Sequence, residues 1–462
     1  MDAKGASTTP RTGFATLTTL RARFRGRRER DRQSGVAFLI TISSLSLLIA
    51  LVAQFTYGTT VDAAQAVNAR DEVRAHYLAR SAVSLSRLLI KIQLRFVEPI
   101  MQTAQNMLNT QAGGQDLGIS LRVTDYVTPL LGFFSGSKME TELLGGIIGV
   151  DTTGATGLGI PAGHMDAEIT NEDGKIDINC GGGMTPNRSQ QVMVFRLLQA
   201  LMGSPRYNWL FEQRNSQGQF VDRVDLARAI IDWADADEQA FAVDANSSGP
   251  EDYRYDQRED PYQAHNNRYD TVDETNLVRG MDPDYAEAFA SNFTVYASDP
   301  KQTCRVNLAS VKGDCTPLIV GLVRAALFPD PSKPPTDLSI LDDNRLYPLA
   351  SILCERSRSV GFDSLKTLIG VLSNPAGSIS RDDPRYQLMQ NLTGITINEQ
   401  QLSQVAYVGA PRVYRVVATG ESGKVKKRII VILDSKGFLA NPVTNNPAGE
   451  QASGVVRYWR EE

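Results

Sequence analysis

A run of 26 uncharged residues, Val36 to Val61, constrains this 462-residue chain more than any other feature. Its first 22 residues, Val36–Tyr57, are mostly apolar. As a helix they would span about 33 Å, close to the roughly 30 Å hydrocarbon layer of a bilayer. Because a helix satisfies its own backbone hydrogen bonds, it can cross that layer. The sequence therefore predicts one transmembrane segment, residues 36–61.

The sequences before and after this run differ in charge. Residues 1–35 carry nine Lys or Arg against three Asp or Glu, whereas the remainder carries 39 basic and 49 acidic residues. The positive-inside rule then places the N-terminus in the cytoplasm and the acidic body on the other side of the membrane. The formal net charge of −4 argues against a nucleic-acid-binding protein.

Three interpretations of the N-terminal region compete. The apolar run is longer than the usual core of a cleaved secretory signal, and no small-x-small site follows closely. A plain signal anchor would leave Met1 in place. In a prepilin-type leader, by contrast, cleavage on the cytoplasmic side after Gly35 makes Val36 the new N-terminus. Gly35 has no side chain and follows the last charged residue, Arg32, so a peptidase could reach its backbone.

The residues after the apolar run favour the prepilin interpretation. No Gly occurs between Gly58 and the first Pro of this region, Pro99. The apolar residues in between recur at helical spacing, which predicts one continuous helix of about 60 residues over 36–97. One face of it is apolar: Val73, Tyr77, Leu85, Leu88, Leu89, Ile92 and Phe96.

The rest of the body mixes helices and strands. Residues 110–165 are Gly-rich and predict loops with one short helix near 129–134. Alternating residues on both sides of Asn171–Gly174 predict a β-hairpin over 165–179. A second hairpin is expected over 412–433 and a third strand over 454–459. Helical patterns occupy 188–210, 219–240, 283–292, 316–328, 346–357 and 362–373.

Four stretches carry a family resemblance: the junction at 35–37, ITNEDGKIDIN (169–179), AIIDWADADEQ (229–239) and NLVRGMDPDYAEAF (276–289). In this order they resemble the K-type minor pseudopilins of bacterial type II secretion systems. The resemblance implies a single-pass inner-membrane protein with a periplasmic body, placed at the tip of a short pseudopilus. The implied partners are the I and J minor pseudopilins, the major pseudopilin and the prepilin peptidase, which would also methylate the Val36 amine.

The resemblance also implies the fold class and its division. The expected fold is α+β and pilin-like, interrupted by a large α-helical insertion similar to sterile-alpha-motif modules. The expected parts are a basic leader (1–35), the transmembrane segment (36–61), the pilin-like helix and first strands (62–179), the helical insertion (180–405) and the C-terminal strands (406–462).

The residue at position 40 bears on where this subunit would lie within a pilin-like filament. Most pilin-like subunits carry Glu at the fifth mature position, where it neutralises the amine of a neighbouring subunit inside the apolar core. Here that position is Ile40. A subunit without this carboxylate needs no amine above it, so it can occupy the tip.

The acidic stretch 231–287 is the candidate metal site. It holds 16 Asp or Glu against four Arg, and such a cluster repels itself unless it is solvated, paired or metal-bound. Carboxylate oxygens suit Ca²⁺, and the resemblance implies calcium in the helical insertion. The expected ligands are Asp235, Asp237, Glu251 and Asp252. A solvated acidic loop is the alternative. The NEDG motif at 171–174 is interpreted as a turn rather than a second metal site.

The four cysteines would face an oxidising compartment, and Cys304 with Cys315 is the favoured disulfide, ahead of Cys180 with Cys354. Zinc is not expected, because there is no CxxC pair.

No GxSxG, HExxH or phosphate-binding motif suggests an enzyme. Two alternatives to a tip pseudopilin are a minor pilin of a type IV pilus and a signal-anchored periplasmic calcium-binding protein or hydrolase.

Overall fold

The computed structural model divides the chain into two compact units, Met1–Asp71 and Glu72–Glu462. The residues that it describes are 17–100, 103–104, 124, 127–128, 130–131, 163–215, 218–243, 249–251, 255, 261–296, 299, 301, 303–311, 313–328, 342–359, 361–362, 364–437 and 454–462. The predicted loops of 110–165 and the helix near 129–134 lie mostly outside these residues.

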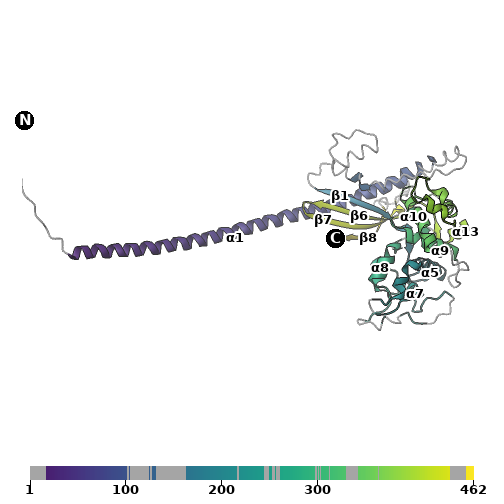
Figure 1. Ribbon diagram of the computed structural model, residues 1–462, viewed down its shortest axis with the longest axis horizontal. Coiled ribbons are helices and arrows are strands. Elements are labelled where there is room, and N and C mark those ends of the chain that lie inside the picture. The colour runs from purple at the N-terminus through teal and green to yellow at the C-terminus, as the bar shows by residue number, and fades with distance from the viewer. Residues whose placement is uncertain are drawn as a thin grey trace, which may run out of the picture. The chain divides into compact units, whose positions relative to one another are not determined.

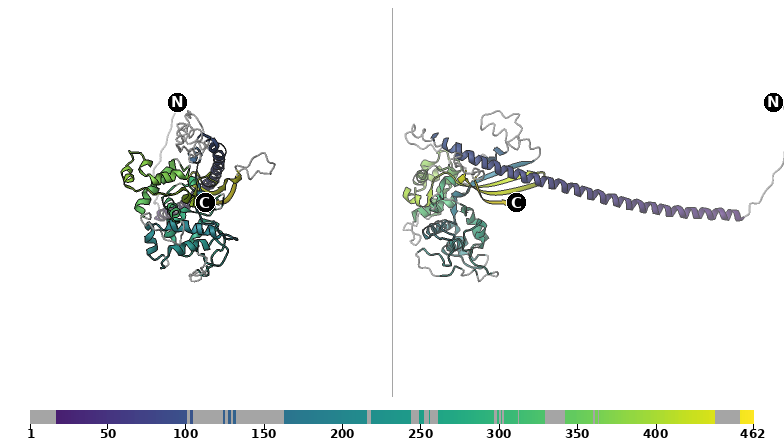
Figure 2. Two further views of the ribbon diagram at one scale, coloured as in Figure 1. Left: turned by 90° about the vertical axis from the view of Figure 1, so that its right-hand side faces the viewer. Right: turned by 180° about the vertical axis from the view of Figure 1, so that it is seen from behind.

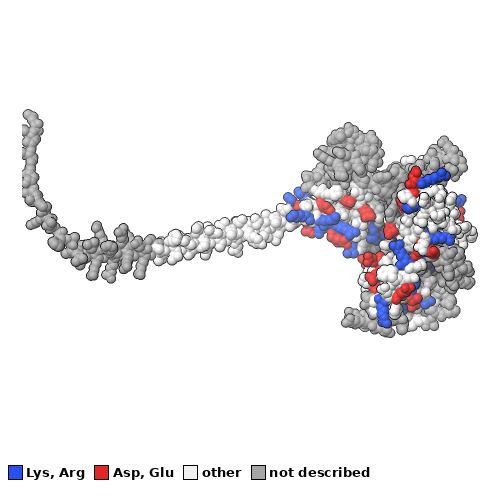
Figure 3. Space-filling model, in the orientation of Figure 1, with Lys and Arg blue, Asp and Glu red and all other residues white. Residues whose placement is uncertain are grey.

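The first unit is built on helix α1 (Leu17–Ile92), which continues into the second unit. A five-residue π-helical turn, η1 (Gln93–Val97), follows it, and helical structure extends to Ile100. The single long helix predicted over 36–97 is therefore confirmed. Within the part of the chain that the structure describes, this is the one helix long and apolar enough to cross a membrane, and it fits a single-pass anchor. Its apolar stretch shows neither acidic nor basic side chains (Figure 3).

The serine and threonine hydroxyls in the apolar stretch Val36–Tyr57 are satisfied within the helix. Ser43 Oγ donates to the Leu39 carbonyl at 2.8 Å, and Ser44 Oγ donates to the Ile40 carbonyl at 2.6 Å. Such bonds to the preceding turn pair the serine and threonine hydroxyls, which would otherwise be unfavourable in an apolar surrounding.

The second unit contains a four-stranded antiparallel sheet in the order β1-β6-β7-β8 (Figure 1). Its strands are β1 (His164–Asn171), β6 (Val413–Ser422), β7 (Val425–Asp434) and β8 (Val455–Glu461). The predicted C-terminal hairpin and third strand are thus confirmed. β6 alternates buried and half-buried residues, as expected for a strand with one face against a core.

The C-terminal part of α1 packs on this sheet at very close range. A Cβ added at Gly420 in β6 would lie 2.1 Å from the Ala75 carbonyl oxygen, so only glycine fits there. The shared core contains the buried residues Leu78, Ala79, Ala82, Val83, Leu89, Ile90 and Leu94 of α1 with Met165, Ala167, Ile169, Tyr414, Val416, Ala418, Ile429, Val431 and Leu433 of the sheet. The amphipathic face predicted in this helix is partly confirmed, because Leu89 is buried whereas Val73, Tyr77, Leu88 and Phe96 are exposed.

A second, larger core lies among the helices between β1 and β6. These helices gather beside the sheet end where β1 finishes and β6 begins, and Figure 2 shows the grouping from two further sides. They are α5 (Arg188–Met202), α6 (Asn208–Glu212), α7 (Arg223–Asp232), α8 (Pro283–Phe289), α9 (Thr316–Leu327), α10 (Asp343–Ser359), α11 (Leu365–Ser373), α12 (Tyr386–Asn391) and α13 (Glu399–Val405). The predicted α+β class is confirmed.

Short elements connect these helices. They include 3₁₀ turns η3 (Glu172–Gly174), η4 (Pro205–Tyr207), η5 (Val272–Leu277), η6 (Ala290–Asn292), η7 (Leu308–Ser310), η9 (Ala376–Ser378) and η10 (Ser435–Gly437). Two small parallel pairs join β2 (Ile176–Asp177) to β3 (Phe293–Thr294) and β4 (Val306–Asn307) to β5 (Ala406–Tyr407).

The hairpin predicted over 165–179 is wrong. β1 pairs with β6, and β2 pairs with β3, so the two halves of the expected hairpin belong to different sheets. The physical reason is the burial of the intervening residues. Glu172 is fully buried and Asp173 is 3% exposed, so the segment that the sequence presents as a solvated turn lies inside the protein.

Candidate functional site

The acidic cluster is built where α7 ends. Asp222 caps the start of this helix by accepting the amide protons of Val224 and Asp225, and the chain leaves the helix just before Trp233. The turn that follows lies beside the glycines before α5, because Gly183 N donates to the Ala234 carbonyl at 2.7 Å. A Cβ on Gly182 would lie 2.5 Å from that same oxygen. This close approach carries Asp235 into the interior.

Glu251 enters the same region from a distant loop. Its backbone N–H donates to the Glu238 carbonyl at 3.4 Å, and the preceding Pro250 bridges to Gln239. Asp235 and Glu251 are each 2% exposed. Gln191 of α5 donates its side-chain amide to Asp235 Oδ2. Outside this pair of acids, neither oxygen of Glu251 nor Oδ1 of Asp235 has a hydrogen-bond partner among the described residues, and the two carboxyl groups lie within hydrogen-bond reach of each other.

Burial and mutual repulsion strongly raise the pKa values of these acids. Burial raises the pKa of Glu251 to about 10, and the neighbouring Asp232, Asp235 and Asp237 add to the rise. The pKa of Asp235 rises to about 7, again through burial first and then through Asp237 and Asp232. Unless a cation is present, a proton must therefore remain in this cluster at neutral pH.

The residues of the cluster supply some, but not all, of the ligands that a hard cation such as Ca²⁺ needs. Two buried carboxyl groups with unsatisfied oxygens are suitable ligands for Ca²⁺. Asp237, in contrast, is exposed and its Oδ1 accepts the Gln239 amide proton at 2.9 Å, whereas Asp252 lies outside the described residues. Among the residues with described positions, no three His, Cys, Asp or Glu side chains already converge as ligands. The structure thus brings Asp235 and Glu251 together, but not the complete predicted set.

Asp232 is a third acid of this cluster that the sequence analysis did not select. Its Oδ1 accepts the Phe241 amide proton at 2.7 Å, and its Oδ2 lies 3.6 Å from Arg279 Nη2. Burial raises its pKa to about 6. Its ion pair with Arg279 makes it a support for the cluster rather than a free ligand.

An aromatic group packs beside the acids. Trp233 lies between Asp232 and Asp235 in the chain, and its ring centroid is 5.8 Å from Tyr255, 6.0 Å from His265 and 6.5 Å from Tyr269. Trp233 is 4% exposed. These rings form part of the helical core, and they make Trp233 a natural optical reporter for the acids on either side of it.

Two disulfides differ from the predicted pairing. Cys180 bonds to Cys304 and Cys315 bonds to Cys354, each pair with Cα atoms 5.6 Å apart. The predicted Cys304–Cys315 and Cys180–Cys354 bonds are therefore wrong. The chain between Cys304 and Cys315 does not close on itself, because it forms β4 and η7, which are buried in the core. Tertiary contacts, rather than sequence proximity, select the partners.

The buried pair Glu172 and Asp173, which we call the junction carboxylates, connects the sheet to the helical body. Glu172 Oε1 accepts Arg415 Nε of β6 at 2.6 Å and Lys175 Nζ at 3.2 Å. Its other oxygen accepts the Thr294 hydroxyl proton of β3. One side chain therefore contacts the four-stranded sheet and the strand that belongs to the helical core.

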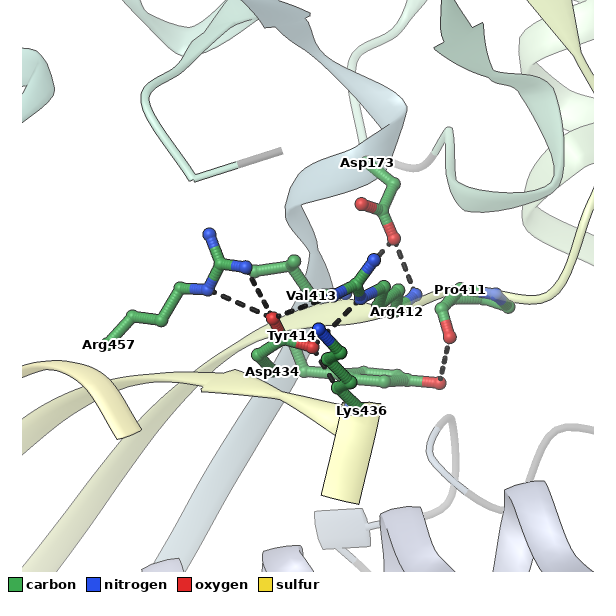
Figure 4. A network of polar contacts seen from close by, with 8 residues as sticks. All are labelled: Asp173, Pro411, Arg412, Val413, Tyr414, Asp434, Lys436 and Arg457. Atoms are coloured by element: carbon green, nitrogen blue, oxygen red, sulfur yellow. Dashed lines mark hydrogen bonds and ion pairs between the residues drawn. The ribbon is translucent and has the colours of Figure 1, made fainter. Parts of the chain in front are cut away.

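The second junction carboxylate holds the start of β6 (Figure 4). Asp173 Oδ2 accepts the amide protons of Arg412 and Val413, the latter at 3.0 Å. The Arg412 side chain in turn contacts Asp434 at 3.0 Å, and Arg457 of β8 pairs with that same aspartate. The charged network therefore runs from the end of β1 across three strands, at the point where the chain returns from the helical body.

The predicted processing site lies within helix α1. A Cβ built on Gly35 meets no atom within 4 Å, and the same holds at Gly58. Val36 is 57% exposed. Packing within the structure therefore does not require glycine at position 35.

Comparison with known families tests the resemblance. Residues 183–298, which include the acidic cluster and the Trp233 group, match the family model described as type II secretion system protein K. This segment is therefore similar to type II secretion system protein K. The resemblance predicted from the sequence is confirmed over these residues.

One solved structure is similar to the chain over a longer range. It is a chain of the GspK-GspI-GspJ complex from the type 2 secretion system of enterotoxigenic Escherichia coli, with 14% identity and a TM-score of 0.39. The similarity covers 65% of this chain and 80% of that one. No curated protein sequence matches.

Proposed function

We propose that this protein is a non-enzymatic minor pseudopilin that initiates or caps the periplasmic pseudopilus of a type II secretion system. The observation that carries the proposal is a segment similar to protein K in the same chain as one apolar helix, Gly35–Ile100, that runs on into the sheet core. A plain signal anchor needs no such continuity. In a pilin-like subunit, one half of the helix remains in the inner membrane and the other supports the periplasmic body.

Processing follows from this arrangement. We expect prepilin peptidase to cleave after Gly35 and to methylate the Val36 amine. N-terminal sequencing of the membrane-derived protein tests this, and a chain that begins at Val36 supports the proposal. A Gly35→Val variant should keep Met1. The matched control is Gly58→Val, because neither glycine has an atom within 4 Å of its added Cβ. If the unsubstituted chain begins at Met1, it is a plain anchor instead.

A stripe on the exposed face of α1 is suited to a partner helix. Val73, Tyr77 and Leu88 are 56%, 61% and 50% exposed. At about 100° per residue they lie within roughly 60° of one another around the helix. Exposed apolar residues aligned in this way mark helix-in-groove or helix-to-helix contacts. We propose that the I and J minor pseudopilins bind here, and that the major pseudopilin follows below them.

Co-purification with the two minor pseudopilins tests the stripe. Leu88→Lys should reduce their recovery at least tenfold, because it places a charge within the apolar contact. The control is Leu388→Lys in α12, since Leu388 is 49% exposed and lies in the helical body. Equal recovery with both variants would remove the stripe as the binding surface.

The position at the tip is supported by Ile40 and by the helical body. Ile40 lacks the carboxylate that a subunit within the filament uses to neutralise the amine of its neighbour. A body as large as the one between β1 and β6 would also be hard to repeat along a thin filament. Gold labelling of a C-terminal tag on overproduced pseudopili should mark one end only. Label along the filament would instead favour a repeated subunit, as in the alternative of a type IV pilus.

Calcium binding is proposed at Asp235 and Glu251, with Asp237 and Asp252 as further ligands. The support is the pair of buried carboxyl groups, three of whose four oxygens accept no hydrogen bond from outside the pair among the described residues. Calcium would supply charge compensation there and hold the loop of Glu251 against the end of α7. Titration calorimetry on the full chain in detergent should lose one site in Asp235→Asn and in Glu251→Gln. Unchanged stoichiometry in both variants would exclude these ligands and leave a proton-sharing acidic cluster.

A further inference from the structure

A cavity of about 450 Å³ lies within the second unit, between β1 and the helical body. The residues Ala167–Asn171 of β1 form one wall, and the helical body contributes residues that include Ser310, Asp314 and Leu318. Sites for small ligands usually enclose roughly 300–1,000 Å³, whereas one water occupies roughly 30 Å³. The cavity is therefore large enough to receive a whole side chain.

The charged side chains that line the cavity leave it negative. Glu168 and Asp314 line it from different walls, and both are exposed to solvent. Within the described part of the chain, no ion pair or hydrogen bond engages either carboxylate. The basic residue of the described lining, Lys175, is already paired with Glu172 at 3.2 Å. A cation in the cavity would therefore meet two carboxylates that have no other partner among the described residues.

Both acids are carried by rigid backbone. Glu168 lies in β1, which pairs with β6 along its whole length. Asp314 lies between Gly313, whose φ of +75° suits glycine, and Cys315, which is bonded to Cys354. The disulfide thus holds the loop of Asp314 beside the cavity. Charges fixed in advance bind a ligand at a lower cost in conformational entropy than charges on mobile loops.

A buried hydroxyl gives a second, independent indication of a ligand. Ser310 lines the cavity and is 1% exposed. Its hydroxyl has no hydrogen-bond partner in the part of the chain that the structure describes. A buried hydroxyl without a partner is unfavourable. A ligand with N–H donors would pair with this oxygen, and a positive charge on the same ligand would compensate the two carboxylates.

Apolar side chains complete the lining. Val127, Ile169 and Leu318 line the cavity and are 4%, 6% and 4% exposed. Such surfaces cover the methylene stem of a long basic side chain while its charged end contacts polar groups. A bare metal ion would leave them uncovered. Moreover, among the described residues no three His, Cys, Asp or Glu side chains converge to hold such an ion.

We propose that this cavity receives a lysine or arginine side chain of a partner protein. The ammonium or guanidinium group donates to the Ser310 hydroxyl and is attracted by Glu168 and Asp314, while its stem packs on Leu318. A free diamine shares this chemistry, but its second ammonium group would meet apolar lining or Lys175. The cavity belongs to the second unit alone, so the proposal does not rest on a position at the tip of a filament.

The test follows the methyl resonances of Leu318 and Ile169 in the full chain in detergent. The probes are the blocked pentapeptide Gly-Ser-Lys-Ser-Gly, the same peptide with an acetylated lysine amine, and the free diamine cadaverine. At millimolar concentration, the lysine peptide should cause saturable shifts, and acetylation should weaken binding at least tenfold. Shifts with cadaverine but not with the lysine peptide would overturn the assignment to a partner protein.

Substitutions test the residues of the cavity. Asp314→Asn and Ser310→Ala should each weaken binding of the lysine peptide at least threefold, and Glu168→Gln combined with Asp314→Asn at least tenfold. Ser310→Ala removes no hydrogen bond among the described residues, so its urea midpoint should not fall. The matched control is Asp382→Asn, at an exposed aspartate absent from the described lining, which should bind normally. The proposal is overturned if no shift saturates, if the acetylated peptide binds equally well, or if Asp382→Asn weakens binding as much as Asp314→Asn.

Discussion

Removing the charge of Glu172 should weaken the connection between the sheet and the helical body and so lower the free energy of unfolding. Glu172→Gln keeps the size of the side chain but replaces a carboxylate that accepts Arg415 Nε at 2.6 Å and Lys175 Nζ at 3.2 Å. Burial acts to raise the pKa of Glu172, but these two cations outweigh it, so the pKa lies below its ordinary value. The folded state therefore holds the charged form.

The magnitude follows from the burial of the three groups. Removing one partner of a buried ion pair costs about 3–5 kcal/mol. Glu172 is fully buried, but the side chains of Arg415 and Lys175 are 27% and 25% exposed, so each keeps some contact with water. We therefore expect the lower end, about 3 kcal/mol, which is about 1 M in the urea midpoint for a chain of this size.

Urea unfolding of the full chain in detergent, followed by tryptophan fluorescence and circular dichroism, measures this effect. The matched control is Glu421→Gln in β6, whose partner Lys426 lies at 2.8 Å, with the side chains of Lys426 and Glu421 65% and 45% exposed. An exposed pair contributes less than about 1 kcal/mol. Equal losses in the two variants, or a loss below about 1 kcal/mol in Glu172→Gln, would refute the reasoning.

The pH dependence provides an internal check on the same variant. Because the folded pKa of Glu172 is lowered, its contribution is present above the ordinary glutamate pKa and is lost as pH falls through the folded value. The difference between the chain and Glu172→Gln should therefore be full at pH 7 and shrink in acid. A difference that stays constant down to acid pH would point to lost packing instead of lost charge.

Four further outcomes are expected. In EDTA, stability should fall as pH rises from about 5 to 9, because the folded pKa of Glu251 is raised to about 10, and Glu251→Gln should flatten this dependence in urea titrations. Calcium should change the fluorescence of Trp233, measured after the other two tryptophans are replaced by phenylalanine. Replacing both Cys315 and Cys354 by serine should cost about 2–4 kcal/mol, and peptide mapping without reduction should recover that pair intact from the unsubstituted chain. Gly420→Val should lower the yield of folded protein, since its Cβ would meet the helix backbone at 2.1 Å, as a trypsin-sensitivity assay would report.

The candidate site was only partly predictable from the sequence. The density of acids over 231–287 indicated the region, and Asp235 and Glu251 do meet in the interior. Asp237 is exposed although it lies two residues from Asp235, because the turn after α7 directs neighbouring side chains differently. The role of Glu172 could not be predicted, since its partners Arg415 and Thr294 are more than a hundred residues away.

The sequence by itself determined the features that depend on neighbouring residues. The uncharged run of 36–61, the continuous helix after it and the hairpin of β6 and β7 follow from hydrophobicity, from the lack of helix breakers and from alternation, all of which act locally. Tertiary structure decided which cysteines pair, that β1 pairs with β6 instead of the residues next to it, and that two acids in an apparent turn are buried. These outcomes depend on which distant segments share a core, and burial can reverse the meaning of a charged residue that looks solvated in the sequence.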